Sequence, residues 1–116
     1  MRIKMDAAQA NGLFEFAMLK DLDPAEMQPQ KAGRDTEELK LVDGKPVYRV
    51  RVTASDRESD REMADVSLKV KNKPSAKIGR TFDLKLAGNV VVTPYVTSNN
   101  RQGYSIVADG LAEAGK

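Results

Sequence analysis

Apolar and polar side chains alternate with a period of two residues over much of this chain. In residues 46–54, Tyr48 and Val50 share the apolar parity, and residues 63–72 and 80–86 repeat the pattern. Because successive side chains of a strand point to opposite faces, this period predicts strands with one buried and one solvent-exposed face. No segment sustains a helical period over three turns, so the chain is predicted to be all-β.

Turn signals separate the apolar runs and set the order of the strands. Asp43-Gly44 suits a hairpin turn that needs positive φ, and Gly88 predicts a bend inside a long strand. In the segment 80–86, Phe82 is expected to point inward together with Leu84 and Leu86. The predicted strands cover residues 1–5 (at an edge), 13–20, 39–42, 45–54, 63–72, 80–86, 90–97 and 104–111.

A single domain spanning residues 1–116 is expected from this length. Residues 21–38 are polar and interrupted by Pro24, Pro29 and Gly33, which predicts an extended, flexible loop with one helical turn near 24–27. Residues 112–116 are expected to be a frayed end. Closure of the strands into a small five-stranded barrel is favoured over a sandwich, because it removes exposed strand edges.

Composition narrows the functions that the chain can have. It has no His and no Cys, so the usual general base, the commonest metal ligand and any thiolate site are missing, and an enzyme is the least expected class. No cofactor or metal site is predicted. No apolar run is long enough to span a membrane and no signal-peptide pattern is present, so a cytoplasmic protein without membrane contact is expected.

The net charge of +2 hides an asymmetry: residues 1–66 have a net charge of −3, and residues 67–116 have a net charge of +5. Strand parity places four cations on the solvent side of neighbouring strands: Arg49, Arg51, Lys69 and Lys71. Lys85 is a further outward cation on the next strand. Such a surface is either an ordinary solvated face or a groove that binds phosphates.

A polar loop, Ser98 to Gly103, is flanked by Tyr95 and Tyr104 and contains Arg101. Bound single strands need aromatic faces for the bases and cations for the backbone, and this hairpin offers both. The alternative is that one or both tyrosines belong to the core, since Tyr104 shares the parity of Ile106.

The run from Asp43 to Val52, the segments 65–70 and 78–84, and the long Tyr-bearing hairpin resemble the OB-fold single-stranded DNA-binding proteins of phages and plasmids. The layout is similar to the filamentous-phage gene V type and to small OB-like proteins of actinobacterial mobile elements. The resemblance implies a five-stranded OB-like barrel with nucleic acid across its second and third strands. It puts Arg49, Arg51, Lys69 and Lys71 on the binding face and Tyr95 with Arg101 on a gripping hairpin. The chain lacks the Trp, the Gly-rich tail and the acidic tip of the bacterial housekeeping type, so recruitment of replication partners through such a tail is not expected.

We therefore expect a non-catalytic protein of a phage or plasmid that binds single-stranded DNA with little sequence preference. RNA as the ligand and a homodimer both stay open. The alternative is a phage structural or assembly protein with no nucleic-acid role. The predicted nucleic-acid-binding residues are Arg49, Arg51, Lys69, Lys71, Lys85, Tyr95, Arg101 and Tyr104.

Overall fold

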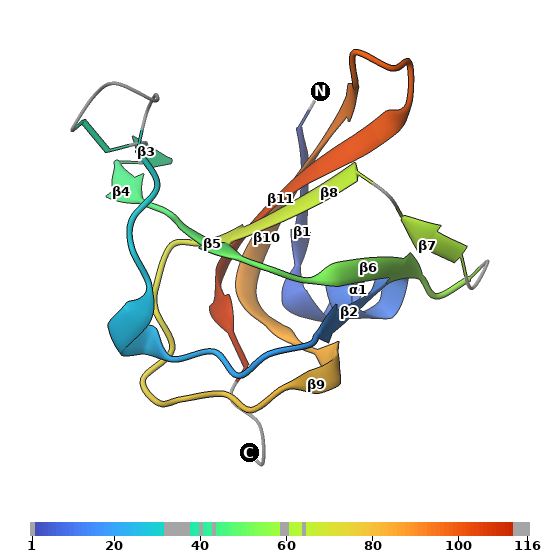
Figure 1. Cartoon of the computed structure of the whole chain (residues 1–116). Helices are drawn as coiled ribbons and strands as arrows, with labels where there is room; N and C mark the ends of the chain where they lie inside the picture. The colour runs from blue at the N-terminus through green and yellow to red at the C-terminus, as the bar shows by residue number, and fades with distance from the viewer. Residues whose placement is uncertain are drawn as a thin grey trace.

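The computed structural model describes residues 2–31, 38–39, 41–42, 44–58, 61–63 and 65–112. Two β-sheets and a short ribbon make up this part of the chain (Figure 1). The five-stranded sheet has the order β1 (Ile3–Asp6), β10 (Leu86–Val96), β11 (Gln102–Leu111), β8 (Asp65–Val70), β5 (Tyr48–Val50). The four-stranded sheet has the order β7 (Arg61–Met63), β6 (Thr53–Asp56), β2 (Phe14–Met18), β9 (Thr81–Leu84). The ribbon pairs β3 (Leu41–Val42) with β4 (Lys45–Pro46).

This architecture is mostly β, as the alternating pattern predicts. The Asp-Gly hairpin is also confirmed, since β3 pairs with β4 and Gly44 has a φ of +78°. β1 lies at an edge of its sheet, where an N-terminal edge strand was expected. Within the described residues, no helix is long and apolar enough to cross a membrane.

The helix α1 (Ala7–Leu13) was not predicted. A capping box starts it: the Asp6 carboxylate accepts the Gln9 amide at 2.8 Å, and the Gln9 side chain accepts the Asp6 amide at 3.0 Å. Asn11 exchanges two hydrogen bonds with the backbone of Leu86. The capping box and the hydrogen bonds between Asn11 and Leu86 therefore stabilise a two-turn helix. Its sequence has no hydrophobic period from which a helix could be predicted.

Three parts of the chain contribute strands to both sheets. β5 leads into β6 through residues 51–52, β9 leads into β10 through Lys85, and β7 and β8 flank residue 64. The single run predicted for residues 45–54 is thus β4, β5 and the start of β6. Strands that switch sheets make the corners of orthogonally packed β-structures.

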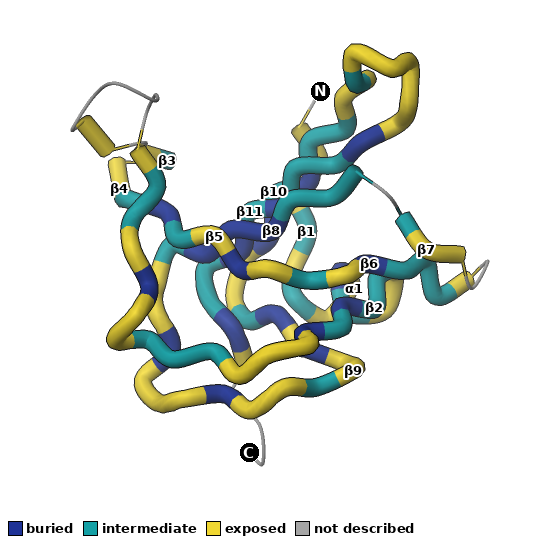
Figure 2. Tube along the Cα trace, in the orientation of Figure 1, coloured by how far each residue is buried: buried dark blue, intermediate teal, exposed yellow. Residues whose placement is uncertain are grey.

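The core lies between the two sheets, where Figure 2 shows the buried parts of the trace. Phe16, Leu68, Leu86 and Ile106 are among the fully buried side chains. Val50 is buried while its neighbours Arg49 and Arg51 are exposed, so the predicted parity of this segment is correct.

The prediction that Phe82 points inward is wrong, because this side chain is 77% exposed. Leu84 pairs with Phe16, but Thr81 pairs with Met18, so the register between β9 and β2 shifts within this short pairing. This bulge shifts the parity and turns Phe82 outward while Leu84 stays buried.

Gly88 marks a second irregularity, as the sequence predicts. The register between β10 and β11 shifts between Ala87 and Val90, and Gly88 has a φ of +79°. Beyond this bulge the two strands form a long hairpin, and β11 pairs on its other side with β8 in parallel.

The segment 21–38 makes several anchoring contacts in its described part. Leu22 and Ile78 exchange two backbone hydrogen bonds, the Gln30 amide donates to the Val47 carbonyl, and Met27 is buried. The predicted helical turn is a 3₁₀ helix, η1 (Pro24–Glu26). Residues 32–37 and 113–116 lie outside the described residues, and the flexibility of the loop and the fraying of the C-terminal end stay predictions.

Candidate nucleic-acid interface

One row of side chains crosses the outer face of the five-stranded sheet, the face opposite to the core. The strand registers join Lys4 to Val91, Val91 to Val107, Val107 to Lys69, and Lys69 to Arg49. The neighbouring row, Met5 to Tyr48, faces the core and contains the buried residues Val90, Ala108 and Val70. Cations therefore stand at both ends of an outer row with two valines at its centre.

Arg49 and Arg51 are exposed cations at the β5 end of this face. Neither forms an ion pair with any described residue. Arg49 also lies directly opposite Lys69 in the strand register. Two exposed guanidinium groups without ion pairs among the described residues favour an anionic ligand at this position.

Lys69 is on the predicted face, but the expectation that it is solvent-exposed is wrong, because only 9% of the residue is accessible. β8 is an interior strand with β11 on one side and β5 on the other, so neighbours flank the stem of Lys69 on both sides. Parity gives the face of a side chain and does not give its exposure.

Lys71 and Lys85 differ from Arg49 because each faces a carboxylate. The ammonium of Lys71 is 3.7 Å from an Asp109 oxygen, and that of Lys85 is 3.0 Å from an Asp83 oxygen. Asp83 also pairs with Arg57, so Lys85 belongs to an ion-pair cluster at β9 in the other sheet. The structure therefore does not bring Lys85 together with the four strand cations.

Tyr95 lies at the outer end of β10 and is 40% exposed. Its ring covers Gly103: a Cβ at Gly103 would lie 2.6 Å from the Cε2 and Cζ atoms of Tyr95. Gly103 in turn pairs with Asp65 of β8, whose carbonyl is 3.5 Å from the Tyr95 hydroxyl. The aromatic side chain thus lies on the same outer face as Arg49 and retains exposed ring surface.

Tyr104, one of the predicted binding residues, lies on the other face of the sheet. It packs partly buried against the core, with its ring centroid 6.4 Å from that of Phe14. It follows Gly103 directly, so strand alternation turns it inward when Gly103 faces outward. The core alternative for this tyrosine is the one that the structure supports.

Arg101 is exposed in the turn between β10 and β11. The Thr97 amide donates to the Arg101 carbonyl at 2.8 Å, and the Arg101 amide donates to the Thr97 hydroxyl at 3.1 Å. Asn100 has a φ of +61° in the same turn. The backbone around Arg101 is therefore fixed, and its side chain extends from the end of the hairpin that also bears Tyr95.

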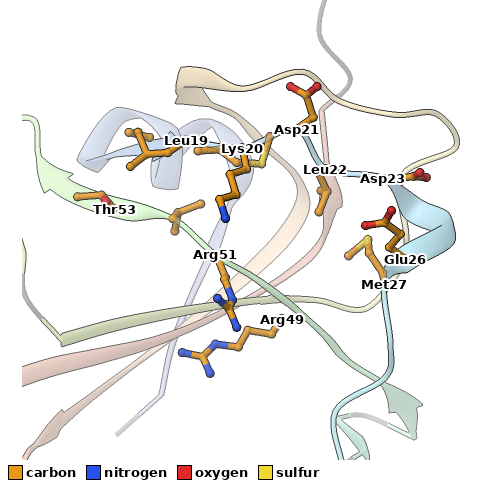
Figure 3. Close-up of a pocket in the computed structure, with 13 residues that line it drawn as sticks. Leu19, Lys20, Asp21, Leu22, Asp23, Glu26, Met27, Arg49, Arg51 and Thr53 are labelled. Carbon is orange, nitrogen blue, oxygen red and sulfur yellow. The ribbon is translucent and has the colours of Figure 1, made fainter.

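A pocket of about 430 Å³ adjoins this face, between residues 17–27 and the passage from β5 to β6. Arg49 and Arg51 line one side of it, and the side chain of Lys20 points toward Arg51 (Figure 3). Sequence reasoning missed Lys20, which lies just beyond the end of β2. The pocket gathers three cations that form no ion pair with the described residues.

The chain gives no significant match to protein-family models, to curated protein sequences or to solved structures.

Proposed function

We propose that this protein binds single-stranded nucleic acid, with single-stranded DNA of a phage or plasmid as the first ligand to test, across the outer face of the five-stranded sheet. The observation that carries the proposal is the pair Arg49 and Arg51, exposed and without ion pairs among the described residues, of which Arg49 shares the outer face of the sheet with the partly exposed ring of Tyr95. The arginines meet the phosphates, and Tyr95 stacks on a base. No catalytic step is part of the proposal.

The strand pairings support an OB-like barrel as the scaffold. Five parts of the chain, 14–18, 48–56, 61–70, 81–96 and 102–111, each contain strands that pair with strands of two others. Following the partners leads from β2 to β6, through β5 and β8 to β11, then through β10 and β9 back to β2. OB-folds bind oligonucleotides on the face of their second and third strands, whose parts in the five-stranded sheet are β5 and β8 here.

The test is a fluorescence titration of labelled oligo-dT at several salt concentrations, with a matched duplex for comparison. Arg49→Glu and Arg51→Glu are expected to weaken binding to single strands. Each should flatten the dependence of log K on log salt by about 0.7 for every phosphate that the protein no longer neutralises, because each neutralised phosphate releases condensed counterions. An oligo-U strand of equal length compares RNA with DNA.

Arg61→Glu is the matched control, since Arg61 is an exposed arginine on β7 of the other sheet. It makes the same change in net charge and should leave affinity and salt slope close to those of the unaltered protein. If folded Arg49→Glu and Arg51→Glu proteins keep full affinity, or if Arg61→Glu weakens binding equally, the outer face is not the binding surface.

A structural or assembly role is the second candidate, and exposed apolar side chains favour it. Phe82 is 77% exposed on β9, and Val96 is 65% exposed at the end of β10. Large apolar side chains at the surface are typical of protein interfaces when they form a patch. A self-association that persists in high salt and disappears in Phe82→Ser, together with absent oligonucleotide binding, would favour this role.

A further inference from the structure

The pocket beside Arg49 and Arg51 has a floor and a second rim that phosphate binding does not use. Buried Met18 and Met27, with partly buried Leu22, provide the apolar part of the pocket lining, which we call the floor. In Figure 3, Glu26 and Met27 lie across the pocket from Arg49 and Arg51. A pocket with a cationic rim, an apolar floor and an acidic rim discriminates between ligands by more than their charge.

Three carboxylates stand on the acidic side, and two of them already bond to the backbone. Asp21 accepts the Arg80 amide at 2.9 Å, and Asp23 accepts the Ala25 amide at 3.0 Å. Glu26 is exposed, and its side chain has no hydrogen bond or ion pair with the described residues. It is therefore the acceptor on this rim that a ligand can use.

We propose that this pocket receives one nucleotide unit of the bound strand, with its base on the floor between Met18, Leu22 and Met27. The phosphate of that unit lies on the rim of Lys20, Arg49 and Arg51. Glu26 accepts hydrogen bonds from the edge of the base. This inference rests on the proposed function and deepens it, because it adds a base preference to a surface that otherwise tracks the backbone.

The preferred base follows from the chemistry of Glu26. A carboxylate accepts hydrogen bonds and donates none, so it favours bases that carry amino groups. Guanine presents a ring N–H beside its amino group, and these two parallel donors match the two oxygens of a carboxylate. Thymine carries a carbonyl oxygen in place of an amino group and therefore leaves the carboxylate poorly satisfied. The pocket is expected to favour guanine over thymine.

The experiment is an NMR titration of the ¹⁵N-labelled protein with dGMP, dTMP and inorganic phosphate. The expected result is that dGMP shifts the amides of Leu22, Met27 and Lys20 and binds more tightly than dTMP, by about 5- to 100-fold if Glu26 accepts two hydrogen bonds. Inorganic phosphate should bind more weakly than either, because it makes no contact with the floor.

Glu26→Gln tests the acidic rim with little change of shape. It should abolish most of the preference for dGMP over dTMP, because the amide group accepts with one oxygen only. Glu62→Gln, an exposed change on β7, is the matched control and should keep the preference. Lys20→Met should weaken both nucleotides by a similar factor, since it removes a phosphate contact and leaves the base contacts in place.

The outcomes separate this inference from the proposed function. If oligo-dT binds in an Arg49-dependent way but dGMP binds no better than phosphate, or Glu26→Gln keeps the base preference, the pocket inference is wrong and the sheet surface stands. If dGMP binds as expected while no oligonucleotide binds, the pocket is a site for free nucleotides and the proposed function is wrong. Shifts confined to residues outside the pocket overturn the inference.

Discussion

Tyr95 and Gly103 depend on each other at the scale of single residues. The ring can lie across the sheet because Gly103 has no side chain, and the ring covers a backbone that is buried as a result. An aromatic ring placed over a glycine in a neighbouring strand stabilises the pair and holds the ring in one orientation. Binding of a base to Tyr95 then requires little reordering of the ring.

Tyr95→Ala is expected to weaken oligonucleotide binding by about 1 to 3 kcal/mol without changing the salt slope, because it removes a stacking face and no charge. Gly103→Ala should also weaken binding, since its Cβ would lie 2.6 Å from the Tyr95 ring and displace it. In the Tyr95→Ala background, Gly103→Ala should have almost no further effect. Fluorescence titrations of the two single variants and the double variant measure this; full additivity of the two effects would contradict the coupling.

The bulge in β10 shows how an element depends on one backbone conformation. Gly88 has a φ of +79°, and the Asp109 side chain accepts the Asn89 amide at 2.8 Å next to it. The same Asp109 pairs with Lys71. The segment around Gly88 therefore fixes the bend of β10 and its pairing with β11. Through Asp109 it also helps to position the side chain of Lys71.

Two glycine-to-alanine changes should act in opposite directions. Gly88→Ala is expected to destabilise the protein by about 1 to 3 kcal/mol, because alanine at positive φ is strained and its Cβ would meet Asp109 at 2.6 Å. Gly12→Ala in α1 should stabilise the protein by about 0.4 to 1 kcal/mol, because alanine lowers the conformational entropy of the unfolded chain. A Cβ added at Gly12 would meet no neighbouring atom within 4 Å, so the folded state has room for it. Urea unfolding decides this, and shifts of the same sign would contradict the conformations of these two segments.

Arg57 connects elements that are distant in the sequence. Its guanidinium donates to the Asn11 carbonyl at the end of α1 and pairs with Glu15 of β2 and Asp83 of β9. Partial burial on its own raises the pKa of Asp83, but the hydrogen bonds from Lys85 and Arg57, with their charges, outweigh it and hold the pKa below the ordinary value.

A lowered pKa makes the stability contributed by Asp83 dependent on pH. The contribution is fully present above the pKa of the unfolded chain, about 3.9, and is lost as the pH falls through the lower folded value. Asp83→Asn should therefore be less stable than the unaltered protein at pH 6, and the difference should shrink as the pH falls below about 3.9. Thermal melts across this range test it. The effect should shrink in high salt because Asp83 is 43% exposed. A difference that grows toward low pH would contradict the assignment.

At the scale of the whole molecule, the alternating sequence pattern predicts the strands and their faces well. It places Val50 inside and Arg49 outside, and the turn residues Gly44 and Gly88 are where positive φ is needed. These features are local, because side-chain alternation and turn chemistry depend on a few neighbouring residues.

Features that depend on distant partners were not predictable from the pattern. The exposure of Phe82 follows from a bulge against β2, and the burial of Lys69 follows from the interior position of β8. Lys20 reaches the arginines only because the segment after β2 lies beside the passage from β5 to β6. A single sequence carries no direct signal for such tertiary contacts between segments that are far apart in the chain.

The parallel pairing of β8 with β11 has a consequence for the chain as it is synthesised. β8 ends at Val70, whereas its partner begins at Gln102 and pairs with it through Ala108. While the ribosome translates the intervening residues, one edge of β8 therefore has no native neighbour, and Leu68 and Val70 lack their partners on β11, Ile106 and Ala108. Domains fold largely as units during synthesis, and contacts of such sequence separation form late. A nascent chain stalled before residue 102 is expected to be protease-sensitive and prone to aggregation, and protection should appear only after β11 has left the exit tunnel.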